Sequence, residues 1–259
     1  MMYITSKDNP RLKLIRRLVQ DPQAYRKLGM MWLEGDHLCS AASARGVQPD
    51  LVIFCESVWP AAEFEWAQSA SEVWVVPDSL FDGFSALESP ARMGFLLALP
   101  EPAGLDPLAP TVVLDRLQDA GNVGAILRSA SAFGFQQILA MKGTAGLWSS
   151  KVLRAGMGAH FGLKLIEQAS TEHVGSLKVP LLGTDVHAGN FLHELLYQGK
   201  LPRRCAWVLG HEGQGVSAEL MALVNLKVRI SQPGGEESLN VATAAAICMH
   251  ASVTSPVVF

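Results

Sequence analysis

One segment of the sequence places an amide and a guanidinium side chain at the start of a predicted helix. Asn122 and Arg128 lie in the stretch Asp115–Arg128, which directly follows the apolar run Thr111–Leu114. A guanidinium can hold a phosphate and stabilise a developing negative charge. The same pattern also fits a helix-capping asparagine followed by an ordinary surface cation, and this segment alone favours that structural interpretation.

Two later loops add glycines and further polar groups. Gly210–Gly215 has three glycines in six residues around Glu212, and glycine lets a backbone approach a ligand closely. Ser238 is predicted to cap the last helix. Asn240, in the first turn of that helix, needs a polar partner from the backbone, from a ligand or from another loop. The dinucleotide pattern G-x-G-x-x-G and the phosphate-loop pattern G-x-x-x-x-G-K-S/T are both absent, which argues against a dinucleotide-binding enzyme and an NTPase.

Apolar strands that alternate with helices are predicted to position these loops. This alternation is typical of a mostly parallel sheet with helices on both faces. Ligands of such sheets bind beyond the carboxyl ends of the strands, where the three polar segments fall. The predicted strands of this part are Thr111–Leu114, Gln137–Ala140, Leu163–Ile166, Pro180–Gly183, Ala206–Leu209 and Val228–Ile230.

A proline-rich stretch divides the chain into two parts. Four prolines fall within Pro100–Pro110, which is typical of a linker. We therefore expect one domain over residues 1–100, a linker over 101–110 and a second domain over 111–259. In the first part, Asn9 is predicted to cap a helix that begins at Pro10, and the remaining pattern indicates an α/β sandwich. Its predicted strands are Met31–Leu33, Leu51–Phe54, Val73–Val76 and Phe95–Leu99.

The composition indicates a globular protein of the reducing cytoplasm. The 259 residues are 49% hydrophobic and 17% charged, which is enough to bury a large core and excludes a disordered chain. Four widely spaced cysteines show neither a disulfide framework nor the ligand spacing of a zinc site. The stretch Leu239–Phe259 lacks Asp, Glu, Lys and Arg, but its polar Asn240, His250 and Pro256 predict a buried helix in place of a membrane anchor.

The net charge of −3 hides a gradient along the chain. Residues 1–45 hold eight Lys or Arg against four Asp or Glu, whereas residues 46–110 hold one against ten. A basic amino-terminal segment on a mildly acidic protein is typical of a nucleic-acid contact, because phosphate attraction depends on where the charge lies. An ordinary solvated helix face explains the same charge equally well.

Taken together and in this order, the three polar segments resemble the motifs of the SpoU family, also called TrmH, of RNA 2′-O-ribose methyltransferases in the SPOUT superfamily. The first motif matches Asn122–Ala130, the second Gly210–Gly215 and the third Ser238–Ala242. The stretch Ser150–His160 is similar to the family's region after the first motif. The altered turn around Ile230–Pro233 departs from the family pattern.

The resemblance implies a knotted α/β fold, with a carboxyl-terminal trefoil knot and S-adenosylmethionine as the cofactor. The resemblance implies a proton-abstracting role for Arg128, but guanidinium groups are not deprotonated in proteins. We therefore expect Arg128 to clamp the target phosphate and stabilise the alkoxide. We expect Glu212 to orient that guanidinium, and Asn122 and Asn240 to fix the loops around it. Ser238 completes the implied catalytic set. The implied cofactor-binding residues are Thr184, Asp185, Leu209, Gly210, Gly215, Ile230, Ser238 and Leu239.

The basic start of the chain is similar to the RNA-recruiting domain that many family members carry. The expected RNA-binding residues are Arg11, Lys13, Arg16, Arg17 and Arg154. The resemblance further implies a homodimer and requires no metal, because the sulfonium is already an electrophile. Ribosomal RNA is the expected substrate. The alternatives are transfer RNA, a base-modifying relative, and a non-catalytic RNA-binding or ribosome-assembly protein with the same fold.

Overall fold

The computed structural model describes residues 1–59, 70–85, 87–234 and 238–256. The chain forms two compact units. Unit 1 consists of Met1–Glu101 together with Trp148–Phe161, and unit 2 consists of Pro102–Leu147 together with Gly162–Phe259.

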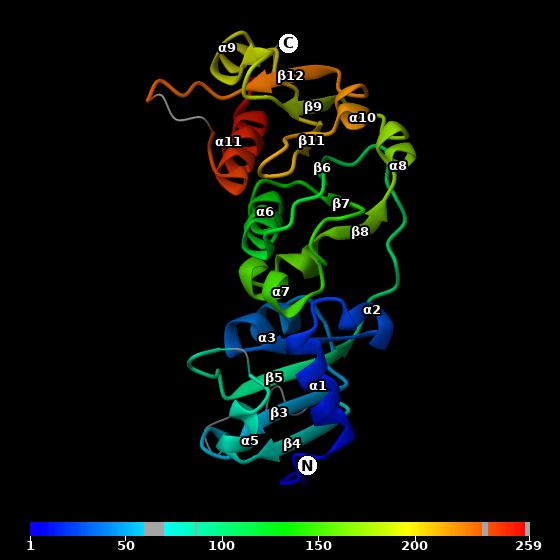
Figure 1. The fold of residues 1–259 in the computed structure, drawn as a ribbon, viewed down its shortest axis with the longest axis vertical. Helices are drawn as coiled ribbons and strands as arrows, with labels where there is room; N and C mark the ends of the chain where they lie inside the picture. Colours follow the sequence, from blue (N-terminus) through cyan, green and yellow to red (C-terminus); the bar gives the residue numbers. More distant parts are fainter. Residues whose placement is uncertain (60–69, 86, 235–237, 257–259) are drawn as a thin grey trace. The chain divides into compact units, whose positions relative to one another are not determined.

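Unit 1 is built on a mixed five-stranded sheet in the order β1-β4-β3-β5-β2, whose strands β4, β3 and β5 are labelled in Figure 1. Strand β5 runs antiparallel to β2 and β3, and the other pairs are parallel. The strands are β1 (Met2–Tyr3), β2 (Met30–Glu34), β3 (Leu51–Cys55), β4 (Glu72–Val76) and β5 (Met93–Ala98). The helices of unit 1 are α1 (Pro10–Gln20), α2 (Ala24–Leu28), α3 (Asp36–Ser43), α5 (Asp78–Asp82) and α7 (Ser150–Gly156), which is followed by the short 3-10 helix η2 (Ala159–Gly162).

The alternation of side chains along β3 creates two cores in unit 1. Leu51 and Ile53 pack on the face covered by α1, and Val52 and Phe54 pack on the face covered by α3. This follows from the period of two along a strand, which sends successive side chains to opposite faces. The predicted helix start is confirmed, because the Asn9 side chain accepts a hydrogen bond from the Arg11 amide.

The segment Trp148–Phe161 belongs to unit 1 although the strands before and after it belong to unit 2. Leu153 of α7 is fully buried in the core that contains β2 and α3. The Ser150 hydroxyl donates to the Leu18 carbonyl at the end of α1 (3.0 Å). The sequence placed this segment in the second domain, because a helix between two strands of one sheet ordinarily covers that same sheet.

Unit 2 contains an all-parallel seven-stranded sheet in the order β10-β12-β9-β11-β6-β7-β8. All six strands predicted for this part are present, and two of them, β6 (Thr111–Leu114) and β11 (Ala206–Leu209), match at both ends. The remaining strands of the sheet are β7 (Gln137–Met141), β8 (Lys164–Ala169), β9 (Leu181–Thr184), β10 (Asn190–Phe191) and β12 (Leu226–Arg229). The sequence missed β10, which has only two residues.

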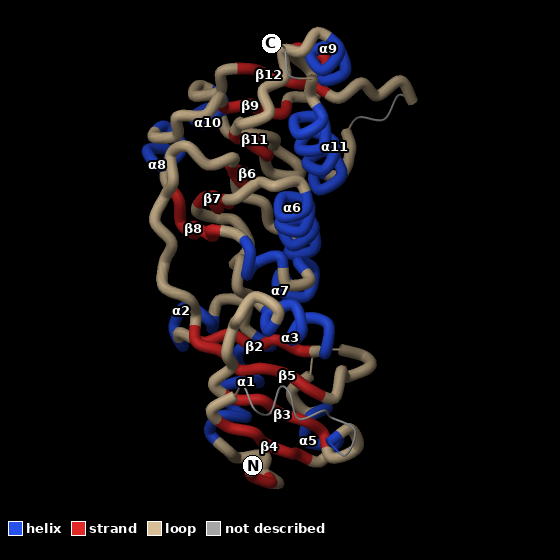
Figure 2. Tube along the Cα trace, turned by 180° about the vertical axis from the view of Figure 1, so that it is seen from behind, coloured by secondary structure: helices blue, strands red, loops and turns tan. Residues whose placement is uncertain are grey.

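Helices cover both faces of this sheet, as predicted. Figure 2 shows α6 (Ala120–Ala132), α9 (Leu192–Tyr197) and α11 (Val241–Thr254) on one side, and α8 (Thr171–Gly175) and α10 (Ala218–Met221) on the other. Trp207 of β11 donates to the Ser252 hydroxyl of α11 (3.0 Å). The rings of Phe133, at the end of α6, and His250 of α11 lie 5.5 Å apart.

Helix α11 is the uncharged carboxyl-terminal segment that the sequence predicted to be a buried helix. It has 14 residues, and Ala245, Cys248 and Met249 are fully buried. In the part of the chain that the structure describes, no helix is both long and apolar enough to cross a membrane.

Candidate functional site

The three polar segments meet at the carboxyl ends of neighbouring strands. Strands β12, β9, β11 and β6 are adjacent in the sheet and all run in the same direction. The loops that follow β6 and β11 therefore lie next to each other. The chain after β12 returns to the start of α11, which packs against α6. Segments separated by up to 118 positions are thus brought to one edge.

A chain of amide hydrogen bonds links the three segments. The Asn240 Nδ2 group donates to Asn122 Oδ1 (2.9 Å), and Asn122 Nδ2 donates to Glu212 Oε1 (3.3 Å). Asn240 Oδ1 accepts the backbone amides of Ala242 (2.9 Å) and Thr243 (3.2 Å). The prediction that Asn240 needs partners is confirmed, since it bonds both its own helix and another loop.

The structure corrects two assignments of helix caps. Asn240 is the residue that caps α11, and Ser238 lies exposed two positions before it. The sequence pattern predicts Ser238 as the cap because serine is a common N-cap, but asparagine caps a helix equally well. At the start of α6, Asp119 is the cap and accepts the Asn122 amide (2.7 Å). The side chain of Asn122 is thereby free to reach the other two segments.

The contacts of Glu212 differ from the predicted one, which was to orient the guanidinium of Arg128. Its carboxylate accepts the backbone amides of Asp119 (3.3 Å) and Gln118 (3.5 Å) and the Asn122 side chain, all from the loop after β6. Partial burial pushes the pKa of Glu212 up, but these hydrogen bonds and one from its own amide outweigh it, so the pKa lies below the ordinary value. Its contacts position the loop after β6, and no contact with Arg128 is among them.

Arg128 stands one and a half turns along α6 from Asn122 with its side chain exposed. Among the described residues, no hydrogen bond or ion pair engages its guanidinium. The group keeps all five N–H donors available for an anion that arrives from outside.

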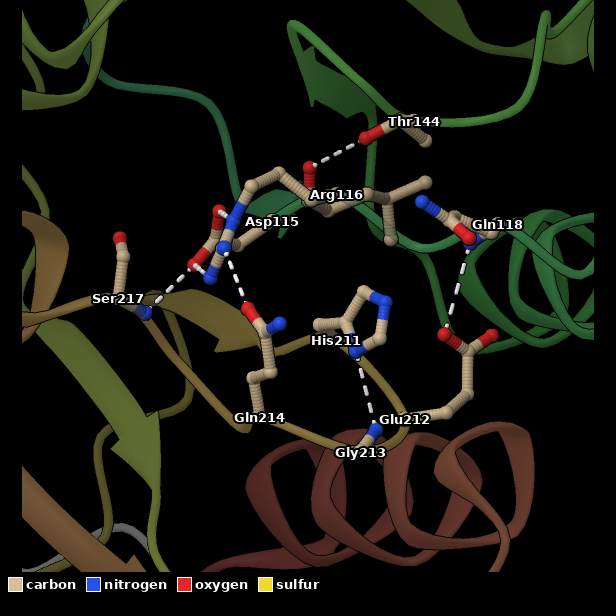
Figure 3. A network of polar contacts seen from close by, with 10 residues as sticks. Asp115, Arg116, Gln118, Thr144, His211, Glu212, Gly213, Gln214 and Ser217 are labelled. Atoms are coloured by element: carbon tan, nitrogen blue, oxygen red, sulfur yellow. Dashed lines mark hydrogen bonds and ion pairs between the residues drawn. The ribbon is translucent and has the colours of Figure 1, made fainter.

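A second polar network, which the sequence analysis missed, lies at the start of the loop after β6 (Figure 3). Asp115, only 2% exposed, accepts Arg116 Nε (2.9 Å) and the Ser217 amide (2.6 Å). Arg116 Nη1 also donates to Gln214 Oε1 (2.9 Å). Burial raises the pKa of Asp115, but the bonds from Arg116 and Ser217 lower it further, so that its net pKa lies below normal. The sequence feature that could have revealed this network is Asp115, a carboxylate directly after an apolar strand.

The glycines of the second segment are required by its tight turn. Gly215 has φ +67°, a conformation that favours glycine, and it pairs with His211 through two backbone hydrogen bonds of 2.8 and 3.0 Å. A Cβ atom on the buried Gly210 would lie 2.0 Å from the carbonyl carbon of Gly215. The backbones of Gly210 and Gly215 are therefore in close contact at the end of β11, with no space for a side chain on Gly210.

The residues expected to bind a cofactor also lie at this edge of the sheet. Thr184 ends β9, Leu209 ends β11, and the half-buried Ile230 directly follows β12. Asp185 holds its own loop, because its Oδ1 accepts the amides of His187 (2.8 Å) and Ala188 (3.1 Å). Leu239 is 37% exposed beside the cap of α11. No group of three or more potential metal ligands occurs within the described residues.

The basic residues of unit 1 fall into two classes. Arg11 pairs with Glu72 (2.8 Å) and lies over the Trp74 ring, and Lys13 pairs with Asp8 (2.9 Å). Arg16 Nε donates to the Gly83 carbonyl (3.2 Å). The side chains of Arg17, which is exposed, and Arg154, which is half-buried, have no hydrogen bond or ion pair with any described residue.

Comparisons with known proteins agree on one family. Residues 109–250 match the sequence model of the SpoU rRNA methylase family. The 23S rRNA (guanosine(2553)-2′-O)-methyltransferase RlmP of Bacillus subtilis is 27% identical over 254 residues, which cover 96% of this chain and 98% of that protein.

Solved structures share the fold over the whole chain. A crystal structure of an RNA 2′-O ribose methyltransferase superposes with a TM-score of 0.79 at 27% identity and covers 98% of this chain and 99% of its own. An rRNA methyltransferase from Sinorhizobium meliloti, solved with AdoMet bound, has a TM-score of 0.82 at 21% identity and covers 97% of each chain.

Proposed function

This chain belongs to the SpoU rRNA methylase family, and from that membership we propose that it transfers a methyl group from S-adenosylmethionine to a ribose 2′-hydroxyl of ribosomal RNA. One observation carries the proposal. The three segments that bear the family's motifs are joined into one site by the hydrogen bonds Asn240–Asn122–Glu212. A protein that kept only the fold would not need this set of polar groups at the carboxyl edge of the sheet.

The loops at this edge fit the proposed cofactor. A purine ring needs apolar contacts on its faces and backbone groups at its rim. The partly exposed side chains of Ile230 and Leu239 offer the first, and the tight turn after Leu209 offers the second. Thr184, Asp185, Gly210, Gly215 and Ser238 complete the proposed binding set. When bound, S-adenosylmethionine supplies an electrophilic methyl group.

The side chains of this chain position the ribose and stabilise charge. A ribose hydroxyl is a weak nucleophile, so it must be oriented and its developing negative charge must be stabilised. The free guanidinium of Arg128 can hold the target phosphate and the alkoxide at once. Because guanidinium groups are not deprotonated in proteins, Arg128 is not the base. Asn122, Glu212 and Asn240 hold the loops around it, and Ser238 lies exposed next to them.

We also propose that the chain after β12 forms the carboxyl-terminal trefoil knot. The strand order supports it, since the chain must cross from β12 past β9 and β11 to reach α11, beside α6. Three strand spacings amount to about 14 Å, a span that the eleven residues between β12 and α11 can cover.

A homodimer is the proposed assembly, with α9 and α11 at its interface. These helices border a cavity of about 570 Å³ whose lining is mostly apolar. Ile247 lines it and is 38% exposed. Symmetric self-association would cover this surface. Sedimentation at micromolar concentration tests the assembly, and a monomer there would rule it out.

Unit 1, which adds Trp148–Phe161 to the predicted domain of residues 1–100, is proposed as the RNA-recruiting domain, and the linker 101–110 joins it to a methyltransferase domain over the remainder of residues 111–259. Support comes from Arg17 and Arg154, whose side chains have no partner among the described residues. The buried free thiols of Cys39, Cys55 and Cys205 suit a reducing cytoplasm.

The decisive experiment is in vitro methylation with labelled S-adenosylmethionine. Ribosomal RNA and transfer RNA from cells lacking the gene serve as separate substrates, and 2′-O-methyl groups are mapped by their resistance to alkaline cleavage. We expect label in ribosomal RNA at one ribose. Label in transfer RNA only would replace the substrate assignment, and label on a base would replace the reaction. No transfer to either RNA, with cofactor bound, would favour a non-catalytic RNA-binding protein.

A further inference from the structure

Arg116 links the loop after β6 to the glycine-rich segment Gly210–Ser217 through Gln214, and it also bonds Asp115, which accepts the Ser217 amide. We propose that Arg116 is a positioning residue that holds the segment Gly210–Ser217 in the conformation that receives the cofactor. The inference rests on the proposed function, because it assigns a cofactor-binding role to that segment.

The first observation is the geometry of the contact. Arg116 Nε and Nη2 face the two oxygens of Asp115 at 2.9 and 3.4 Å, and Nη1 reaches Gln214 at 2.9 Å. The same Asp115 carboxylate accepts the Ser217 amide at 2.6 Å. The planar fork of a guanidinium can span a carboxylate and an amide oxygen together, whereas an ammonium group is a compact point charge.

The second observation is backbone conformation. Arg116 has φ +59°, a region that residues with a Cβ rarely adopt. Gly143, itself at φ +96°, lies beside it, and a Cβ there would come into van der Waals contact with Arg116 Cγ at 3.4 Å. An unfavourable conformation persists only where the surrounding contacts enforce it. The Arg116 side chain contributes its bonds to Asp115 and Gln214 to those contacts.

The third observation is that this attachment is separate from the one at Glu212. Glu212 is held by Gln118, Asp119 and Asn122, whereas Gln214 and Ser217 are held by Arg116 and Asp115. The glycine-rich segment is therefore fixed at two points on opposite sides of Gly213. Release of the Arg116 contact would leave Glu212 in place and loosen the part of the turn that includes Gly215.

The test compares three substitutions of Arg116 in the full chain. Arg116→Gln removes the charge, Arg116→Gly removes the side chain and also relieves the positive φ, and Arg116→Lys keeps the charge without the fork. Arg204→Gln is the matched control, because Arg204 is an exposed arginine of the same unit that donates to the Leu108 carbonyl (2.9 Å), away from both loops. The probes are S-adenosylhomocysteine for binding and S-adenosylmethionine for kinetics.

We expect Arg116→Gln and Arg116→Gly to weaken S-adenosylhomocysteine binding about tenfold, measured by calorimetry. The KM for S-adenosylmethionine should rise in parallel, and kcat at saturating cofactor should stay within about threefold of wild type, because the reacting groups are untouched. Arg116→Lys should recover part of the affinity. Amide hydrogen exchange of residues 210–217 should be faster in Arg116→Gly and unchanged in Arg204→Gln.

Wild-type affinity and exchange in both Arg116→Gln and Arg116→Gly would overturn the inference. A fall in kcat with unchanged affinity would also overturn it, since Arg116 would then act on the reacting groups. If Arg116→Gln does not fold, Arg116→Gly decides, because it carries no strained side chain. A wild-type chain that binds neither probe would refute the proposed function itself, which is a different result from wild-type binding that Arg116 substitutions leave unaltered.

Discussion

Polar side chains are organised differently in the two units. In unit 1 the charged pairs are exposed or half-buried, such as Lys13–Asp8 at 2.9 Å, where both side chains are exposed, and Arg92–Asp82 at 3.0 Å, where Arg92 is half-buried. In unit 2 the polar contacts join loops that are about a hundred residues apart in sequence, and one of them centres on the buried Asp115. Exposed ion pairs contribute at most about 1 kcal/mol each to the free energy of unfolding, so their side chains can exchange partners easily.

The difference indicates how each unit can meet a ligand. Exposed charges that are weakly held can turn to phosphates, which suits electrostatic recruitment. Polar groups fixed by several hydrogen bonds are already in place when a reaction begins, which suits chemistry. The substitutions below and one pH series test this contrast.

The largest effect is expected from Arg128→Ala. Arg128 has no described partner, so its loss should leave the melting temperature unchanged. In the proposed site it stabilises charge in the transition state, and removing such a group lowers the rate about 10²- to 10³-fold. Single-turnover methylation with saturating RNA and cofactor measures this. Retention of most of the rate would make Arg128 an ordinary surface cation, and Arg204→Ala is the control for loss of an exposed arginine.

Asn240→Ala should lower both stability and activity. It removes the cap of α11, which contributes about 1 kcal/mol, and it leaves Asn122 without its hydrogen-bond donor. We expect the free energy of unfolding to fall by about 1 to 2 kcal/mol in urea denaturation.

Asn240→Asp separates the two roles of this residue. Aspartate keeps the capping oxygen but cannot donate to Asn122, so stability should stay near wild type while methyl transfer falls. Equal losses of stability in Asn240→Ala and Asn240→Asp would show that the bond to Asn122, and not the cap, stabilises the fold.

Smaller effects are expected in unit 1. Arg17→Ala should weaken RNA binding several-fold and reduce the slope of log affinity against log salt by about one, because each neutralised phosphate contributes about that much. Arg11→Ala should change RNA binding less, since Arg11 is engaged by Glu72 and Trp74. Filter binding over a salt series distinguishes them. The opposite ranking of the two variants would contradict the division into free and paired cations.

The smallest effect is expected on the loss of stability in acid. The pKa of Asp115 is lowered in the folded state, so its contribution to stability is present above the ordinary carboxyl pKa of about 4 and is lost as the pH falls through the folded value. Melting temperatures should therefore drop more steeply below about pH 4 in wild type than in Asp115→Asn. Glu101→Gln, at an exposed position, is the control. Parallel curves for wild type and Asp115→Asn would show that the carboxylate adds no acid-sensitive stability.

Much of the fold was accessible from local sequence patterns. Apolar runs of four or five residues predicted the central strands in both units, because a strand that is buried on both faces is apolar along its length. The predictions failed where an element is very short, as in β1 and β10, or where a helix serves an unexpected core, as α7 does through Leu153. Local periodicity shows that a helix has an apolar face and says nothing about which core receives it.

The sequence by itself determined the residue types of the site, the loops that carry them and the order of those loops. The tertiary structure decided their partners: Asn240 replaced Ser238 as the cap of α11, and Glu212 bonded the loop of Asn122 and not the guanidinium of Arg128. It also brought Arg116 to Gln214 and Asp115 to the Ser217 amide. The reason is physical, since a hydrogen bond requires two groups within about 3 Å of each other. For residues a hundred positions apart, only the strand order and the helix packing fix that distance.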